Sequence, residues 1–241
     1  MNSITNLLVQ YSNKYKFNID SEKIPIIEKY YNLLLNYQNE KHINLSRITE
    51  PQDFVLKNVI DTLLLNSNLK NENNIIDMGS GNGVPGIIIS ILNPNKKILL
   101  VDSTKKKIEF LNYAIKQLNL INCSAIAERV EVLAKNKKYY ENLDGVIGRA
   151  LAPLEQFVEL AAPFLKINGF MYIQKSQKFD EELKEAQKIL DFCGFLCISN
   201  QEYNIEENYR IISVYQKTKK TPSIFPRNIG DYKKKLKKFG D

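Results

Sequence analysis

The chain has 241 residues, of which 44% are hydrophobic, and this is enough for one substantial core with a small appendage. No stretch approaches the roughly 20 apolar residues of a membrane-spanning helix, so a helical membrane protein is not expected. The formal net charge is +7, and residues 217–241 hold all of it, with nine Lys or Arg against two Asp. A neutral body with a basic tail predicts a polyanionic partner.

The three cysteines have no CxxC spacing, and residues 1–16 lack the basic-then-apolar order of a secretory signal. Both observations favour a reduced, cytoplasmic setting. No metal cofactor is expected.

Residues 1–70 predict a helical N-terminal cap. Ile24, Ile27, Tyr31 and Leu34 recur at helical spacing, and residues 51–65 repeat the apolar pattern after a proline that suits a helix start.

From residue 74 onward, short apolar strands alternate with helices. The expected helices are near 85–92, 104–118, 129–136, 154–165 and 178–193, and the expected strands are near 74–78, 98–102, 123–127, 144–149, 169–175, 195–200 and 209–216. Such alternation predicts an α/β fold with a mostly parallel sheet covered on both faces. No helix separates the last two strands, so they should form an antiparallel hairpin.

These patterns divide the chain into a helical cap (1–70), an α/β domain (71–216) and a basic tail (217–241). The tail contains two prolines and two glycines, and we expect it to dock loosely or to become ordered on binding.

A glycine-rich turn follows the first strand. The strand contains Asp77 near its end, glycines follow at 79, 81, 83 and 86, and an apolar helix begins at residue 85. Glycine permits positive φ and close approach to a ligand, so strand, turn and helix start predict a cradle for a nucleotide-type cofactor. Asp102 ends the second strand about 20 residues later, where a carboxylate can bind ribose hydroxyls.

The cradle alone allows two enzyme classes. Gly81, Gly83 and Gly86 satisfy the GxGxxG pattern of nicotinamide-dependent oxidoreductases, whereas Asp77 and the glycines at 79, 81 and 83 form the DxGxGxG turn of class I S-adenosylmethionine methyltransferases. A structural turn without a ligand is a third interpretation. The terminal hairpin favours the methyltransferase, and an oxidoreductase would also need a proton-relay residue in the crevice, whereas the single histidine, His42, precedes the sheet domain.

If the cofactor is S-adenosylmethionine, the kind of atom that accepts the methyl group can be narrowed by elimination. The segment after the fourth strand, residues 148–153, lacks the Asn/Asp-Pro-Pro-aromatic turn used for exocyclic amines, and no cysteine lies in a loop typical of pyrimidine C5 methylation. Ribose methylation typically has an aspartate at the end of the fourth strand, where this chain has Arg149. A ring nitrogen such as guanine N7 has an available lone pair, so positioning and electrostatics suffice. Arg149 is the candidate catalytic residue.

The chain resembles the bacterial small-subunit rRNA guanine-N7 methyltransferase family (RsmG, also called GidB). The resemblance spans roughly residues 25–230. It is found at Asn44–Ser46, Asp61–Leu63, Asp77–Gly86, Val101–Ser103, Lys106–Leu111, Arg129–Glu131, Ile147–Ala150, Gln174–Ser176 and Phe225–Gly230.

The resemblance implies a class I fold, namely a Rossmann-like seven-stranded sheet with a terminal antiparallel hairpin. It implies S-adenosylmethionine-dependent methylation of N7 of a specific guanine in 16S rRNA of the small ribosomal subunit. Apart from the resemblance, we expect a monomer, although the sequence does not determine the oligomeric state. The implied cofactor-binding residues are Gly79, Gly81, Val84, Asp102, Val130, Glu131 and Arg149.

Basic residues for the RNA are expected at five positions: Arg47, Lys57, Lys106, Lys175 and Arg227. The chain departs from the family at Asn58, usually His, at Gly148, usually Ser, and at Ser176, usually Gly. The first departure removes an expected phosphate or base contact and so bears on target affinity. A non-catalytic RNA-binding module is a further alternative, which the intact glycine turn and Asp102 argue against.

Overall fold

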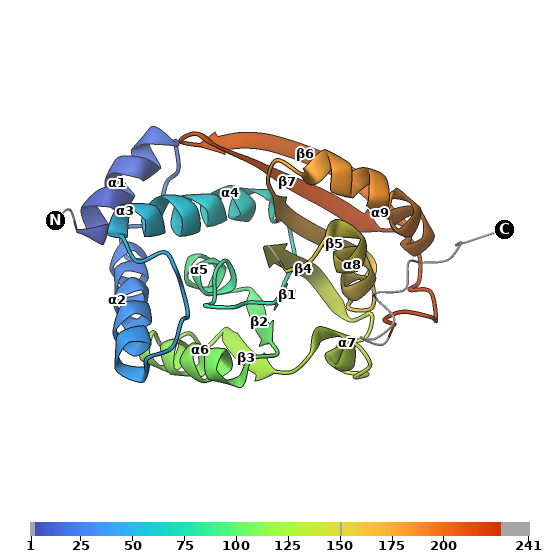
Figure 1. The fold of residues 1–241 in the computed structure, drawn as a ribbon, viewed down its shortest axis with the longest axis horizontal. Coiled ribbons are helices and arrows are strands. Elements are labelled where there is room, and N and C mark those ends of the chain that lie inside the picture. Colours follow the sequence, from blue (N-terminus) through green and yellow to red (C-terminus); the bar gives the residue numbers. More distant parts are fainter. Residues whose placement is uncertain (1–2, 150, 228–241) are drawn as a thin grey trace.

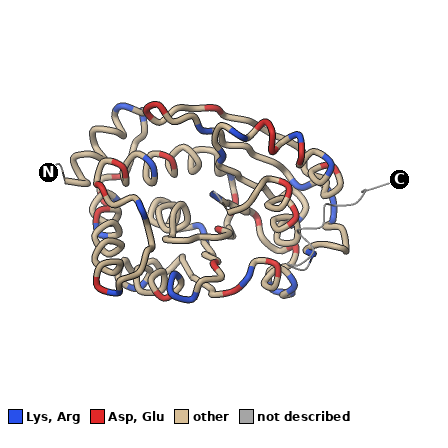
Figure 2. Tube along the Cα trace, in the orientation of Figure 1, with Lys and Arg blue, Asp and Glu red and all other residues tan. Residues whose placement is uncertain are grey.

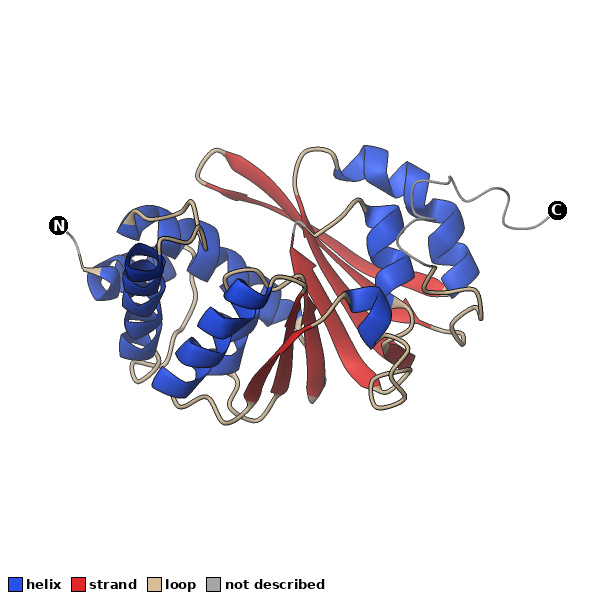
Figure 3. Ribbon diagram, turned by 60° about the horizontal axis from the view of Figure 1, so that its bottom comes forward, coloured by secondary structure: helices blue, strands red, loops and turns tan. Residues whose placement is uncertain are grey.

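The computed structural model describes residues 3–149 and 151–227, which form a twisted seven-stranded sheet with helices on both faces (Figures 1 and 3). The strand order is β3-β2-β1-β4-β5-β7-β6, and β7 runs in the direction opposite to the six other strands. The strands are β1 (Asn74–Met78), β2 (Lys97–Asp102), β3 (Cys123–Ala127), β4 (Leu143–Arg149), β5 (Leu165–Lys175), β6 (Phe195–Ile205) and β7 (Asn208–Lys217). All seven expected strands and the terminal hairpin are confirmed, although β5 begins earlier and β6 ends later than predicted.

The strand order reverses between β1 and β4. From β1 the chain proceeds outward through β2 and β3, and it then returns to the other side of β1 for β4 and β5. Ligands of open α/β sheets bind beyond the carboxyl ends of the strands at such a reversal. The glycine turn after β1 and Arg149 at the end of β4 therefore lie at the expected position for a site.

Helices pack on the two faces of the sheet in two apolar clusters. One face is covered by α1 (Ile4–Lys14), α2 (Ile24–Lys41), α3 (Pro51–Phe54), the π-helix η1 (Val55–Ile60), α4 (Asp61–Asn68), α5 (Gly86–Leu92) and α6 (Lys105–Gln117). The other is covered by α7 (Val130–Leu133), α8 (Leu154–Ala161) and α9 (Phe179–Cys193). The helical cap thus shares one core with α5 and α6, and the Tyr30 hydroxyl donates to the Asn82 carbonyl at 2.5 Å, which links the cap to the glycine turn.

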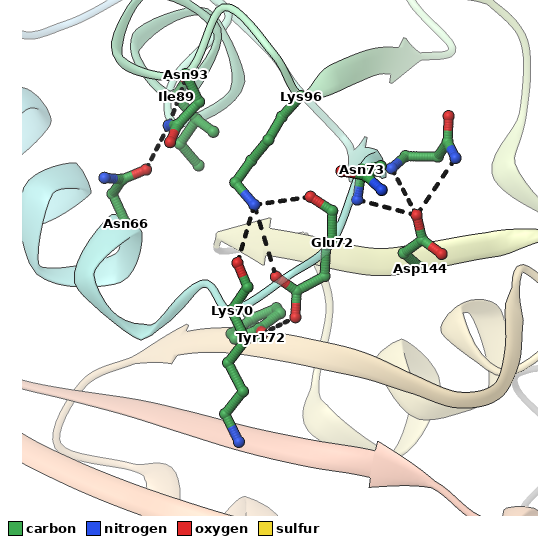
Figure 4. Close-up of polar contacts among 10 residues, drawn as sticks. Asn66, Lys70, Glu72, Asn73, Ile89, Asn93, Lys96, Asp144 and Tyr172 are labelled. Atoms are coloured by element: carbon green, nitrogen blue, oxygen red, sulfur yellow. Dashed lines mark hydrogen bonds and ion pairs between the residues drawn. The ribbon is translucent and has the colours of Figure 1, made fainter.

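A polar network fixes the amino ends of the strands, opposite the expected site (Figure 4). The buried Glu72 carboxylate accepts from the Tyr172 hydroxyl of β5, and Lys96 Nζ donates to the carbonyls of Lys70 and Glu72 at 3.1 and 2.7 Å. The Asp144 carboxylate accepts the backbone N–H of Asn73 and Asn74. These bonds tie the segment before β1 to β4 and β5.

The start of the predicted tail is packed into the body, which corrects the expectation of a loosely docked segment. Lys217 ends β7 and is fully buried; its ammonium donates to Glu141 at 2.8 Å, to Thr221 Oγ1 at 2.7 Å and to two backbone carbonyls. Phe225 is also buried, and the Arg227 guanidinium pairs with buried Glu159 at 2.6 Å. A buried ammonium needs such partners, which residues 141, 162, 165 and 221 supply here. Residues 228–241 lie outside the described part of the chain.

Candidate active site

The glycine turn between β1 and α5 needs its glycines. Gly79, Gly81 and Gly83 have φ values of +70°, +57° and +100°, a region that side chains disfavour. The N–H of Gly79 donates to the Val101 carbonyl of β2 at 2.8 Å, and a Cβ atom at residue 79 would lie 2.5 Å from Leu151 Cδ1. The open space above the turn therefore depends on the missing side chain.

Two carboxylates support the turn from the ends of neighbouring strands. Asp77 is buried, and its Oδ2 accepts the N–H of Gly86 at 2.9 Å, at the start of α5. Asp102 accepts the N–H of Gly81 at 3.0 Å and that of Thr104 at 2.8 Å. Asp77 therefore stabilises the turn from its buried side, whereas Asp102 lies at a cavity beside the turn.

Burial raises the pKa of Asp77 from its ordinary value of 3.8 to about 7, although the Gly86 N–H and the Arg149 cation act in the opposite direction. Between these pH values the folded protein binds a proton that the unfolded chain has lost, so the contribution of Asp77 to stability decreases as the pH rises from about 4 to about 7. The slope approaches about 1.4 kcal/mol per pH unit.

Asp77→Asn is expected to flatten this pH dependence, because the amide stays neutral and its oxygen can still accept from Gly86. Urea unfolding of both proteins between pH 4.5 and 8 measures it, with the variant gaining stability relative to the parent at the alkaline end. Parallel curves over this range would contradict the assignment.

A cavity of about 200 Å³ lies beside the turn and brings four predicted cofactor residues together. Gly79, Asp102, Val130 and Glu131 line it, together with Leu151 and Ala152 from the loop after β4. Gly81 and Val84 do not line it, and Val84 is buried in the core. The volume is below the range of about 300–1,000 Å³ for sites of drug-sized ligands, so a larger ligand requires Leu151 to move away from Gly79.

Arg149 lies in a second, larger cavity and not in the first. This cavity measures about 590 Å³, and Ala152 lines both cavities. Arg149 Nη1 donates to the Lys57 carbonyl at 2.9 Å, and Nη2 donates to Asn58 Oδ1 at 3.0 Å. Arg149 therefore does not line the cavity of the four other predicted cofactor residues, and its contact with the cofactor stays a prediction. The π-helix of the cap holds its guanidinium, which is 23% exposed, in the neighbouring cavity.

The structure gives residue 58 a role that was not predicted. Asn58 is fully buried and accepts from Arg149, which agrees with the expected loss of an RNA contact at this position. The backbone carbonyl of Lys57, which lies within η1, accepts the second bond from Arg149. π-Helical turns are frequent at functional sites, and the apolar pattern of residues 51–65 does not reveal this one.

The five predicted RNA residues are dispersed. Lys57 and Lys175 line the Arg149 cavity, where each has an acidic partner, Asp53 at 2.9 Å and Glu182 at 2.6 Å. Arg47 and Lys106 are exposed elsewhere on the surface, and the pairing of Arg227 with Glu159 argues against its predicted RNA contact. Figure 2 shows basic and acidic residues interspersed around the trace, in agreement with the zero net charge of residues 1–216.

Several residues of the Arg149 cavity were not predicted from the sequence. Asp61, Gln174, Lys178 and Arg210 line it, and they come from α4, β5, the loop before α9 and β7. One signal was available: β4 and β5 are adjacent parallel strands, so their ends meet, and Arg149 pairs with Gln174 in register.

Among the residues that the structure describes, no helix could cross a membrane and no group of three or more His, Cys, Asp or Glu could hold a metal ion.

The described fold and the sequence both have known relatives. A SAM-dependent methyltransferase from Aquifex aeolicus has a TM-score of 0.55 at 14% identity and covers 77% of this chain and 98% of its own. TYW2 of M. jannaschii, in complex with AdoMet, has a TM-score of 0.53 at 16% identity and covers 66% and 76%. These similarities confirm the predicted class I methyltransferase fold.

The sequence relatives are closer. Ribosomal RNA small subunit methyltransferase G of Desulforamulus reducens is 37% identical over 234 residues, covering 95% of this chain and 97% of the relative. The protein of the same name from Mesoplasma florum is 39% identical over 219 residues, covering 89% and 88%. The family model for GidB, rRNA small subunit methyltransferase G, matches residues 23–209, a range that includes both cavities except Arg210. The chain belongs to the rRNA small subunit methyltransferase G (GidB) family.

Proposed function

We propose that this protein transfers the methyl group of S-adenosylmethionine to N7 of a guanine in the RNA of the small ribosomal subunit. The observation that supports this best is the family match, because it spans the glycine turn, Asp102 and Arg149 together. Two adjoining cavities at the strand-order reversal suit a reaction between two bound molecules.

The residues of the smaller cavity fit the cofactor. Gly79 leaves the space that a Cβ atom would fill, Asp102 offers a carboxylate for ribose hydroxyls, and Val130 offers an apolar surface for adenine. When bound, S-adenosylmethionine supplies an electrophilic methyl group on a positive sulfonium, so that transfer leaves the sulfur neutral and the positive charge on the base. The chain needs no general base, because guanine N7 has no proton to lose.

The protein's contribution is then orientation and electrostatics. Arg149 can donate to the guanine O6 beside N7, and the carboxylate of Asp61, 3.6 Å from Arg149 Nη1, offsets positive charge in the same cavity. The pair keeps this part of the cavity close to neutral as the base becomes cationic. We expect the protein to act as a monomer in the cytoplasm.

Two measurements test the function. Calorimetry with S-adenosylmethionine and with NAD separates the methyltransferase from an oxidoreductase, and binding of NAD alone would exclude our proposal. N7-methylguanine is then mapped in rRNA from cells with and without this gene. We expect one modified guanine to disappear with the gene; an unchanged map, together with intact cofactor binding, would point to another substrate.

The C-terminal residues give a further prediction. Residues 228–241 contain five lysines and two aspartates, and deleting them should weaken RNA binding while the fold and the cofactor affinity persist. Each lost phosphate contact flattens the slope of log affinity against log salt by about 0.7–0.9. Filter binding at several salt concentrations measures the slope, and an unchanged slope would assign RNA capture to the body.

A longer deletion is the control. Removing residues 217–241 also removes Lys217 and Arg227 and leaves the buried Glu159 without its partner. Breaking a buried ion pair typically costs about 3–5 kcal/mol, so this variant should melt at a much lower temperature.

A further inference from the structure

A buried polar cluster borders the Arg149 cavity on the side of β5 and β7. Asp61 and Gln174 are 3% and 4% exposed, and both line the cavity. The Tyr203 hydroxyl donates to Asp61 Oδ1 at 2.7 Å, and Gln174 Nε2 donates to the Asp61 carbonyl at 2.8 Å and to Tyr203 Oη at 3.2 Å. Three elements, α4, β5 and β6, thus fix the positions of these side chains.

Two acceptor atoms of this cluster are left without hydrogen bonds. Gln174 Oε1 is buried and has no partner within the described chain. The amide cannot be reversed to satisfy it, because Nε2 faces a backbone carbonyl, which only accepts. Asp61 Oδ2 lies 3.6 Å from Arg149 Nη1, beyond hydrogen-bonding distance. A buried acceptor without a donor, such as Gln174 Oε1, is costly, and Asp61 Oδ2 has only the ion pair with Arg149. Together the two acceptors indicate a ligand that brings two donors.

Basic residues of the cavity favour a ligand that carries a negative charge. Lys178 and Arg210 line the rim, and neither forms a salt bridge with another described residue. A ligand with two adjacent donors and a negative charge satisfies both features. Among the four RNA bases, only guanine presents two adjacent donors, N1–H and the N2 amine, on its Watson–Crick edge. A volume of about 590 Å³ lies within the range of small-molecule sites.

We propose that Asp61 and Gln174 read the Watson–Crick edge of the target guanine after it leaves the RNA stack and enters the Arg149 cavity. This inference rests on the proposed function and names the residues that select the base. Gln174 Oε1 accepts from the N2 amine, and Asp61 Oδ2 accepts from N1–H. Reading of this edge requires an unpaired base, as in other enzymes that modify bases.

The arrangement also contributes to the rate. With its N1–N2 edge on the cluster, the purine directs N7 away from Gln174. Methylation makes the base cationic and its N1–H more acidic, so the bond to the Asp61 carboxylate strengthens as the reaction proceeds. An interaction that is stronger in the transition state than in the ground state raises the rate of methyl transfer.

Inosine tests the inference, because it lacks only the N2 amine and keeps N7, O6 and N1–H. Small-subunit rRNA is prepared with guanosine or inosine at the mapped position, and kcat/KM is measured for the full chain. We expect the parent to prefer guanosine by about tenfold or more. Gln174→Met should bring the ratio of the two substrates close to one. Lys178→Ala is the control, which should slow both substrates equally and leave the ratio unchanged.

Equal use of guanosine and inosine by the parent would overturn the inference, as would a folded Gln174→Met variant with the parent's ratio. Gln174→Ala replaces it if thermal melting shows that Gln174→Met is unfolded. Asp61→Asn should lower kcat on both substrates more than it raises KM, and an unchanged kcat would remove Asp61 from the site. If the parent methylates neither RNA, the proposed function fails, which is a different result from loss of discrimination.

Discussion

Replacing Gly79 by valine is expected to abolish S-adenosylmethionine binding. Gly79 has φ +70°, and an added Cβ would lie 2.5 Å from Leu151 Cδ1, in the space that we propose for the cofactor. The side chain therefore fills the cradle and also prevents Leu151 from packing as it does in the parent. Calorimetry should detect no binding at cofactor concentrations that saturate the parent.

Gly194→Val is a matched control for backbone strain. Gly194 ends α9, far from the turn in sequence, and has the same φ of +70°. An added Cβ there would lie 2.3 Å from Lys219 Cγ, so the exposed Lys219 side chain must change its rotamer. Both variants should lose about 1–2 kcal/mol of stability, but only Gly79→Val should lose the cofactor. Parental affinity in a folded Gly79→Val protein would place the cofactor elsewhere.

Arg149→Ala is expected to lower the rate of methyl transfer by about 100-fold or more, the usual effect of removing one oriented donor from an active site. The structure adds a cost in stability that the sequence did not suggest. Without the guanidinium, Asn58 Oδ1 and the Lys57 carbonyl lose their donor, which costs about 1–3 kcal/mol. Single-turnover methylation and thermal melting of the same preparation measure both effects.

Arg149→Lys separates charge from geometry. Lysine keeps the positive charge but cannot present two fixed N–H groups to the Lys57 carbonyl and Asn58 at once. We expect this variant to be nearly as impaired in rate as the alanine variant and to retain more stability. If either variant were folded and methylated RNA at the parental rate, Arg149 would have no part in the reaction.

Local patterns predicted the fold because each depends on neighbours in the chain. The alternation of apolar strands and amphipathic helices from residue 74 onward placed all seven strands, and the absent helix between β6 and β7 predicted their antiparallel pairing. The glycines at 79, 81 and 83 predicted a turn with positive φ, since few other residues adopt that backbone. Asp102 was placed at the carboxyl end of β2 because it directly follows an apolar run. Parallel strands end at one edge of the sheet, so this position put Asp102 beside the glycine turn.

The sequence by itself thus determined the sheet, the glycine turn, Asp102 and the family resemblance. Only the tertiary structure decided which side chains meet at the site. Arg149 and Asn58 are 91 residues apart, and Lys217 and Glu141 are 76 apart, so no local pattern relates them. The same holds for Gln174 and Asp61, 113 residues apart. Buried polar groups must find hydrogen-bond partners wherever packing brings them. In this chain that requirement holds Arg149 against the cap and supplies the partners of buried Lys217, whereas Gln174, beside the second cavity, keeps one oxygen without a donor.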